Sequence, residues 1–456
     1  MLGWAASVPR VAWVLFAALP LLQLTISATG PVVPEVREAF GLSYAAVGVF
    51  VSSLNLVRLL SDLPAGQLAT RFNGRSLVGV SAVVTVLGCL LGSLAGEYWQ
   101  LLVARAVLGA TTAINQAVIM AWLIRLAGRR NRALVMGLQD AAFSCMVVFV
   151  PPLSGLLAGA LSWRAPFVLG GLSAAVAGGL IWAGTRREQA DAALRDAVGE
   201  QHGDATAGPV GEGPRAREGV GPHPGEASSP LASGRAEDSR QGAPRARSGG
   251  SSSAGRPTLG RLLALGGPTL VAAYALTFAV YFGRNALLQA YLPLLGGTAL
   301  GMSAWSIGLA IGGQSLFGAV ATVGAGLLAD RFGRAVVLWP GFGLLLLAQA
   351  ALLLVRDVEG FYAVVLFQSI GFTLNALPAS LVGDALPRAY GSLGIAGYRL
   401  VADTAILAAP LVMGVALDYT GYHFPVVLLL AETALCATVA LVALRRGQPT
   451  RVLAQG

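Results

Sequence analysis

The chain has 456 residues, of which 55% are hydrophobic and only 12% are charged, and its mean hydropathy is +0.69. A soluble protein of this length needs far more charge to cover its surface, so the composition excludes an ordinary soluble domain and indicates an integral membrane protein. The formal net charge is +9, and the basic residues are arginines, because the sequence contains no lysine. A basic chain can bind nucleic acid, but these arginines lie between apolar runs, as membrane topology requires, and we expect no nucleic-acid partner.

Twelve apolar runs are each long enough, at roughly 20 residues, to cross a bilayer as a helix. They predict an all-α integral membrane protein with twelve transmembrane helices in two pseudo-symmetric six-helix bundles. The predicted helices lie near residues 10–30, 44–69, 76–96, 98–124, 133–160, 165–184, 266–292, 303–329, 335–355, 360–384, 392–417 and 424–444.

The segment between the sixth and seventh predicted helices has a different composition. It is rich in Gly, Ala, Ser, Pro and Arg, lacks apolar periodicity, and holds as many acidic residues as arginines. Such a segment cannot bury a core, so we expect it to be disordered. The predicted domains are an N-terminal bundle at 1–185, a cytoplasmic linker at 186–258 and a C-terminal bundle at 259–456.

The arginines predict the orientation of the chain. They gather on alternate loops, and the positive-inside rule places those loops, the linker and both termini in the cytoplasm. We therefore expect a multi-pass protein of the cytoplasmic (inner) membrane. The arginines on these loops are Arg71, Arg75, Arg125, Arg129, Arg130, Arg132, Arg331, Arg334, Arg388, Arg445 and Arg446.

One loop signature occurs twice, about half a chain length apart. The residues 66–75 read GQLATRFNGR, and the residues 326–334 read GLLADRFGR. The pattern resembles the loop between the second and third helices of the major facilitator superfamily, and its repeat between the eighth and ninth. The resemblance implies a secondary transporter whose substrate binds near the midplane between two repeated halves.

In that family the acid of the signature sits near a helix N-terminus across the interface and helps to close the cytoplasmic side, a charge–dipole interaction. Asp330 takes this place in the second copy, whereas Thr70 replaces the acid in the first copy and Asn73 is an extra residue. The alternative is that both loops only orient their helices. The signature residues expected at the cytoplasmic gate are Gly66, Arg71, Gly326, Asp330, Arg331, Gly333 and Arg334.

Two pairs of charges in the second and eleventh helices predict a further part of this gate. Arg58 and Asp62 are spaced i,i+4, as are Arg399 and Asp403, so each pair shares a helix face. The two helices face each other in the family, and opposite charges match in depth. We expect cross-half pairs Asp62–Arg399 and Arg58–Asp403 in the outward-facing state, broken as the inner gate opens; the alternative is two pairs within their own helices.

Arg105 and Asp140 are the residues expected to couple transport to protons. Arg105 lies in a fourth-helix segment that resembles an arginine–glycine motif of proton-coupled members, and an arginine in hydrocarbon should face the interior. The alternative is a structural arginine bound to carbonyls of a neighbouring helix. Asp140 lies alone in the fifth helix beside Gln139 and could carry a proton, or could pair with an interior cation. Pro151 and Pro152 match the fifth-helix motif of drug–proton antiporters only in part.

Amide and arginine side chains in the cavity-lining helices are candidate substrate contacts. Contacts between packed helices explain the amides equally well. We expect no enzyme activity or cofactor, because the sequence has no phosphate-binding Gly-x-x-x-x-Gly-Lys loop and its three histidines are scattered, and no metal site, because Cys89, Cys145 and Cys436 are isolated. The candidate cavity residues are Asn115, Gln116, Arg284, Gln289 and Asn375.

The favoured function is proton-coupled efflux of a small organic solute by a monomer in the lipid bilayer. The alternative is proton-coupled uptake of a metabolite such as an organic anion, attracted by Arg58 and Arg284. A membrane sensor that uses 186–258 as its output is an interpretation from another class.

Overall fold

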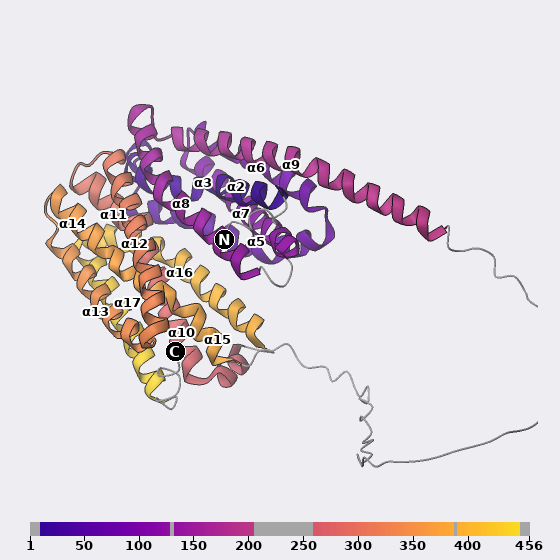
Figure 1. The fold of residues 1–456 in the computed structure, drawn as a ribbon. Helices are drawn as coiled ribbons and strands as arrows, with labels where there is room; N and C mark the ends of the chain where they lie inside the picture. The colour runs from indigo at the N-terminus through magenta and orange to yellow at the C-terminus, as the bar shows by residue number, and fades with distance from the viewer. Residues whose placement is uncertain (1–9, 128–131, 205–258, 387–389, 447–456) are drawn as a thin grey trace, which may run out of the picture. The chain divides into compact units, whose positions relative to one another are not determined.

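The computed structural model describes residues 10–127, 132–204, 259–386 and 390–446, and all regular elements in these ranges are helices (Figure 1). Residue contacts divide the chain into one unit of Met1–Gln189 and Thr258–Gly456, and a second of Ala190–Pro257. Much of the predicted linker, residues 205–258, lies outside the described residues, as does Arg388.

The described residues of the first half of the chain form nine elements. They are α2 (Arg10–Leu22), α3 (Leu24–Ala28), η1 (Gly30–Val32), α4 (Val33–Phe40), α5 (Tyr44–Arg71), α6 (Gly74–Ser93), α7 (Tyr98–Ala127), α8 (Arg132–Ala160) and α9 (Ala165–Asp204).

The second half repeats this order with more interruptions. Its elements are α10 (Leu259–Ala286), η2 (Leu287–Tyr291), α11 (Leu292–Leu294), η3 (Leu295–Ala299), α12 (Ala304–Phe332), α13 (Ala335–Ala351), η4 (Leu352–Leu354), α14 (Val358–Gln368), η5 (Ser369–Ala376), α15 (Pro378–Ala385), α16 (Gly391–Thr420) and α17 (His423–Arg446).

Within the described ranges, twelve helical segments are long and apolar enough to cross a membrane, which confirms the predicted all-α membrane fold. Four of these spans are composite. The first contains α2 to α4, the seventh runs from α10 through the π-helical η2 and η3, the ninth joins α13 to the 3₁₀ segment η4, and the tenth joins α14 and α15 through the 3₁₀ segment η5.

The first span is longer than predicted. It runs over Val11–Phe40, whereas the apolar run indicated an end near residue 30. Its last part, α4, carries three charged residues and ends at Gly41, which adopts a left-handed cap with φ 59°. Pro34 lies in the first turn of α4, where its missing N–H costs no hydrogen bond. Hydropathy detects only the apolar part of a helix and so misses a polar extension.

The α9 helix also continues beyond its predicted end. Residues 186–204 are helical in the structure, although the sequence predicted that the disordered linker begins at 186. The segment 190–204 contains four alanines, one leucine, one arginine, one glutamate and one glutamine, and such residues have high intrinsic helix propensity. Low hydrophobicity therefore indicated the end of the membrane span correctly, but not the end of the helix.

The hydrophobic core shows where the two halves meet. One buried cluster contains residues of both halves, such as Phe50 and Leu54 of α5, Ile311 of α12 and Ala409 of α16. Three further clusters belong to one half each. We call the end of the bundle at Gly41 and Gly421 the predicted external end, and the opposite end the predicted cytoplasmic end.

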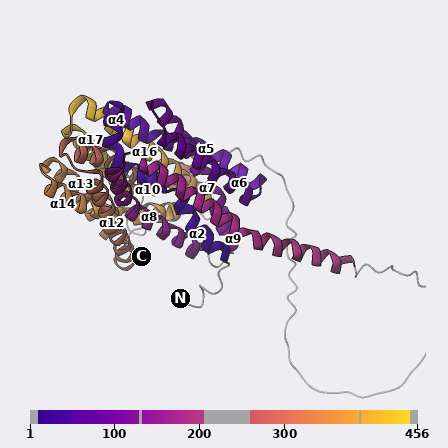
Figure 2. The ribbon, with the colours of Figure 1, turned by 90° about the horizontal axis from the view of Figure 1, so that it is seen from above.

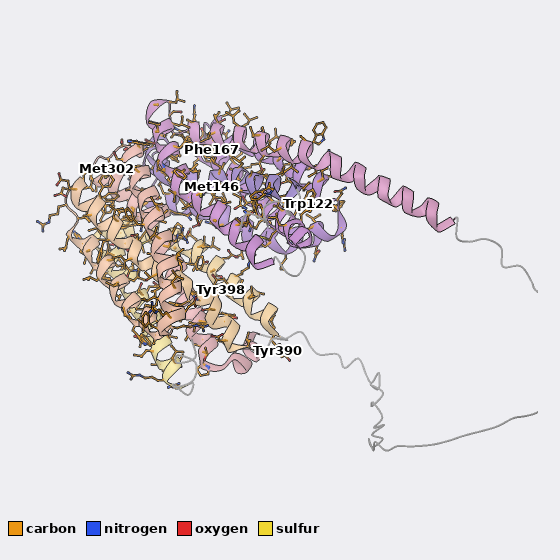
Figure 3. The ribbon with its side chains drawn as sticks, in the orientation of Figure 1. Trp122, Met146, Phe167, Met302, Tyr390 and Tyr398 are labelled. Atoms are coloured by element: carbon orange, nitrogen blue, oxygen red, sulfur yellow. The ribbon has the colours of Figure 1, made fainter. Side chains whose placement is uncertain are left out.

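The halves separate toward the predicted cytoplasmic end. Met302 lies at the predicted external end, whereas Trp122 and Tyr390 lie in different halves near their predicted cytoplasmic ends and well apart (Figure 3). The cluster that joins the halves reaches the external end, with Leu42 and Met302 among its members. On the predicted topology the arrangement is therefore closed outside and open to the cytoplasm.

Glycines allow two helix pairs to approach closely across the halves. Helices α5 and α16 lie side by side, as do α8 and α12 (Figures 1 and 2). A Cβ on Gly48 would lie 2.5 Å from the Pro410 oxygen, and a Cβ on Gly308 would lie 2.3 Å from the Pro151 oxygen. Both neighbours are backbone atoms, so neither contact leaves space for a side chain.

The α8–α12 contact predicts that Gly308→Ala destabilises the protein. The added methyl group would force the two helices apart, and overpacking of this kind costs about 1–3 kcal/mol. Gly324→Ala in the same helix is the matched control, because a Cβ there meets nothing within 4 Å. Thermal unfolding in detergent should show a lower midpoint for Gly308→Ala and an unchanged or slightly higher one for Gly324→Ala. Equal midpoints would contradict the close packing.

Candidate functional site

A cavity of about 170 Å³ lies between the two halves. The N-terminal half contributes residues of α3, α5 and α8, and the C-terminal half contributes residues of α10, η2, α12 and α16. The cavity therefore has the midplane position expected for a transported solute. Its polar lining consists of Ser27, Asn55, Arg58, Tyr281, Arg284, Asn285 and Gln289.

The predicted cross-half pair Arg58–Asp403 is present. The guanidinium of Arg58 donates to the carboxylate of Asp403 at 2.5 Å, and the side chains are 27% and 15% exposed. The pair joins α5 to α16, and Arg58 also lines the cavity. The two charges compensate each other at the cavity wall. The i,i+4 alternative within each helix is not what forms here.

The second predicted pair is absent. Asp62 and Arg399 are both described and exposed, and no ion pair joins them. The helices have already diverged here, and Leu63 is 82% exposed. The expected state of the first pair also needs correction. The pair was predicted to break as the cytoplasmic side opens. On the predicted topology this arrangement is open to the cytoplasm, yet Arg58–Asp403 is formed. The pair lies closer to the predicted external end than the point where α5 and α16 diverge.

Two of the predicted cavity residues line the cavity, together with neighbours that sequence reasoning missed. Gln289 donates to Asn285 Oδ1 at 2.6 Å, and Asn285 Nδ2 donates to the Tyr281 carbonyl at 2.8 Å. Arg284 lines this cavity and also a smaller pocket that contains Asn375. Asn285 could have been found from its i,i+4 spacing to Gln289. Asn55 could have been found because it lies one turn before Arg58.

Asn115 and Gln116 do not line the cavity, and their assignment to it was wrong. Asn115 is fully buried and accepts a hydrogen bond from the Ser81 hydroxyl at 2.7 Å. Gln116 accepts from Gln23 Nε2 at 2.5 Å. Both amides therefore join α7 to its neighbours within the N-terminal half. Sequence spacing identifies polar residues in a helix but does not say which neighbour each one faces.

Arg105 has the geometry of the structural alternative. It is 2% exposed and donates to the carbonyls of Phe50 at 3.4 Å and Val51 at 3.1 Å, and to the Thr29 hydroxyl at 2.8 Å. Its guanidinium also lies over the Phe50 ring, 5.0 Å from the centroid. These contacts fasten α7 to α5 and to the first span. Arg105 is not in the cavity lining, and its role in proton coupling stays a prediction.

Asp140 is the other residue predicted to couple protons. It lies in α8, but its side chain lies outside the described residues. Its neighbour Gln139 is 3% exposed, so this face of α8 is buried. The proposed role of Asp140 therefore remains a prediction.

Asp330 and Arg334 of the second repeated loop form only part of the contacts that the signature predicts. Arg334 forms an ion pair with Asp384 of α15, so this signature arginine acts within its own half. Partial burial lowers the pKa of Arg334, and nearby Asp330 opposes that effect. Among the described residues, Asp330 itself makes no hydrogen bond across the interface and is exposed. The predicted latch by Asp330 is therefore not formed in this arrangement.

The remaining signature residues lie at the surface or cap helices. Gly333 ends α12 with φ 87°, and the Arg331 guanidinium lies over the Phe332 ring at 5.3 Å. Gly66 and Arg71 are exposed, and a Cβ at Gly66 or Gly326 would meet nothing within 4 Å. Their roles in gating stay predictions.

The Arg58–Asp403 pair predicts a coupling energy that a double-mutant cycle measures. Arg58→Ala and Asp403→Ala should each lower thermal stability in detergent, because each leaves one charge unpartnered. The double variant should lose less than the two single losses added together, by about 0.5–3 kcal/mol. Strictly additive losses would mean that the pair contributes nothing to stability.

The family model of the Major Facilitator Superfamily matches residues 15–360 and 273–455. The chain is 26% identical over 144 residues to a probable sugar efflux transporter of Helicobacter pylori (strain HPAG1), over 31% of this chain and 37% of that protein. It is 28% identical over 165 residues to the purine ribonucleoside efflux pump NepI of Salmonella paratyphi A, over 36% and 40%. The aligned region thus spans well under half of these relatives.

Solved structures show the same fold at low identity. A bacterial homologue of the human lysosomal transporter Spinster, inward-facing and occupied, matches with a TM-score of 0.69 and 15% identity over 95% of this chain and 96% of that one. A D-xylose–proton symporter matches with a TM-score of 0.66 and 14% identity over 94% and 96%. With the family model matching most of the chain and twelve spans in two halves around a polar cavity, the protein belongs to the Major Facilitator Superfamily of membrane transporters and is not an enzyme.

Proposed function

We propose that the protein exports a small, hydroxyl-rich solute, such as a sugar or a nucleoside, in exchange for protons by alternating access. The polar lining of the cavity carries the proposal. Amide, phenol and guanidinium groups from both halves face one space, with Asn55 and Arg58 from α5 and Asn285 and Gln289 from the seventh span. Groups of this kind form hydrogen bonds with hydroxyls in many orientations. The efflux relatives named for sugars and purine ribonucleosides support the same class.

Cavity size and charge separate this solute class from the alternatives. A volume of about 170 Å³ is below the roughly 300–1,000 Å³ of sites for drug-sized ligands, which favours a small solute over a bulky drug. Two arginines in the lining favour the uptake of an organic anion. However, Asp403 compensates the charge of Arg58. A neutral polar solute therefore fits the site better.

Transport into inverted membrane vesicles tests this proposal. With an acidic lumen, vesicles that contain the protein should accumulate a labelled sugar or nucleoside, and a protonophore should abolish the accumulation. Gln289→Ala should raise the KM about two- to tenfold, the cost of one hydrogen bond to a neutral group. Gln100→Ala is the matched control, because that amide binds the backbone of a loop outside the cavity. Accumulation of organic anions in right-side-out vesicles instead would support the uptake alternative.

Asp140 is proposed to carry the exchanged proton. Asp140→Asn should abolish proton-driven accumulation but leave solute exchange between the two sides, because exchange needs no net proton movement. Asp357→Asn provides the control, since Asp357 accepts a single capping hydrogen bond from Gly360 N at the start of α14, and an asparagine oxygen can still accept it. Normal uphill transport by Asp140→Asn would show that the proton is carried elsewhere.

A further inference from the structure

The contact between α5 and α16 is a series of cross-half interactions in antiparallel register. Residue numbers rise along α5 as they fall along α16. From the predicted external end inward, Tyr44 meets Asp418, Ser52 donates to the Leu407 carbonyl at 2.8 Å, and Arg58 meets Asp403. The next turn of each helix places Asp62 opposite Arg399, where the helices have separated. The cross-half contacts are therefore formed at the predicted external end and absent at the predicted cytoplasmic end.

Asp418 forms the outermost of these interactions. Its two carboxylate oxygens accept from the backbone N–H groups of Tyr44 and Ala45, each at 2.8 Å. These are the first two residues of α5, whose N–H groups have no partner within the helix. A carboxylate at this position also interacts favourably with the positive end of the helix dipole. A residue of one half thus caps a 28-residue helix of the other half.

Other contacts at the same end depend on the position that Asp418 fixes. The hydroxyls of Tyr44 and Tyr422 lie 3.2 Å apart, and Tyr422 also contacts the Thr298 hydroxyl. Tyr291 donates to the Tyr422 carbonyl at 3.0 Å. A Cβ on Gly414 would lie 2.3 Å from the Tyr44 oxygen, so the backbones touch directly. The cap therefore holds together the ends of the second, seventh and eleventh spans.

We propose that Asp418 is the external latch of the transport cycle. Its hydrogen bonds to α5 stabilise the externally closed state and must break before the outer side opens. Arg58–Asp403 lies between the two ends of the series and serves as the pivot, while Asp62 and Arg399 come together at the cytoplasmic end only when the latch is released. The inference rests on the proposed alternating access, but its test measures conformation without any solute. Failure of the latch and failure of the proposed substrate class are therefore distinguishable.

Spin-label distances in lipid nanodiscs test the latch. Cys89, Cys145 and Cys436 are first replaced by serine or alanine. One label pair at Leu94→Cys and Leu354→Cys reports on the predicted external end, and a pair at Phe72→Cys and Phe332→Cys reports on the other. All four positions are well exposed, at 77%, 76%, 58% and 59%.

Asp418→Asn should increase the population with long external and short cytoplasmic distances about two- to fivefold, the size of a charge–dipole interaction. Asp418→Glu keeps the charge and should restore most of the native distribution. Ser43→Ala is the matched control: the Ser43 hydroxyl accepts from Ala46 N at 3.1 Å, so it caps the same helix from within its own half. It should lower thermal stability without changing either distance.

Two results would overturn the proposal. One is an unchanged distance distribution in Asp418→Asn, and the other is an equal shift in Ser43→Ala, which would mean that any loss of capping has the same effect. If Asp418→Asn does not fold, Tyr422→Phe replaces it. That variant keeps the ring but loses the hydroxyl contacts, and a shift in the same direction supports the latch, whereas no shift contradicts it.

Discussion

A charged side chain inside a bilayer persists only where a protein group or water compensates it, and this requirement determines where most polar residues of this chain lie. Arg105 is compensated by carbonyls and a hydroxyl, which ties α7 to α5 and the first span. Arg58 is compensated by a carboxylate from the other half. The first set of contacts joins elements within the N-terminal half, and the second links the two halves. Two arginines of similar chemistry thus have different consequences, depending on the half that supplies the partner.

The sequence predicted the features that follow from hydropathy and helical spacing. The twelve spans derive from apolar length and the repeated halves from the duplicated loop signature. The Arg58–Asp403 contact derives from charges four residues apart, together with the family resemblance that places the second and eleventh helices face to face. The prediction failed where the outcome depends on rotation about the helix axis. Asn115 and Gln289 are both amides in helices that were expected to line the cavity, yet one binds Ser81 and the other lines the cavity. Nor did hydropathy anticipate the helical residues 186–204 of α9, because hydropathy does not measure local helix propensity.

The duplicated architecture uses its two equivalent helix contacts differently. The α8–α12 contact places Gly155 and Gly308 against backbone of the opposite helix, beside Pro151 and Pro152. This contact depends on shape alone, so the two helices approach closely whatever charges lie nearby. The α5–α16 contact has the same glycine approach at Gly48 and Gly414 and adds carboxylates at two depths. Among the side chains that the structure describes, the carboxylate contacts across these two symmetry-related helix pairs therefore lie at α5–α16.

The two π-helical stretches of the seventh span give it a degree of freedom that an uninterrupted helix lacks. A π turn holds one more residue than an α turn, so each stretch, Leu287–Tyr291 and Leu295–Ala299, rotates everything beyond it by about 100° relative to a continuous α-helix. Tyr281 and Arg284 precede both stretches, whereas Thr298 lies at the far end. If the outer stretch, Leu295–Ala299, returned to α-helical hydrogen bonding, the external end of this span would turn while the cavity residues up to Gln289 kept their places. The span can therefore adjust the external closure and the solute site independently, by moving an extra residue along its own backbone.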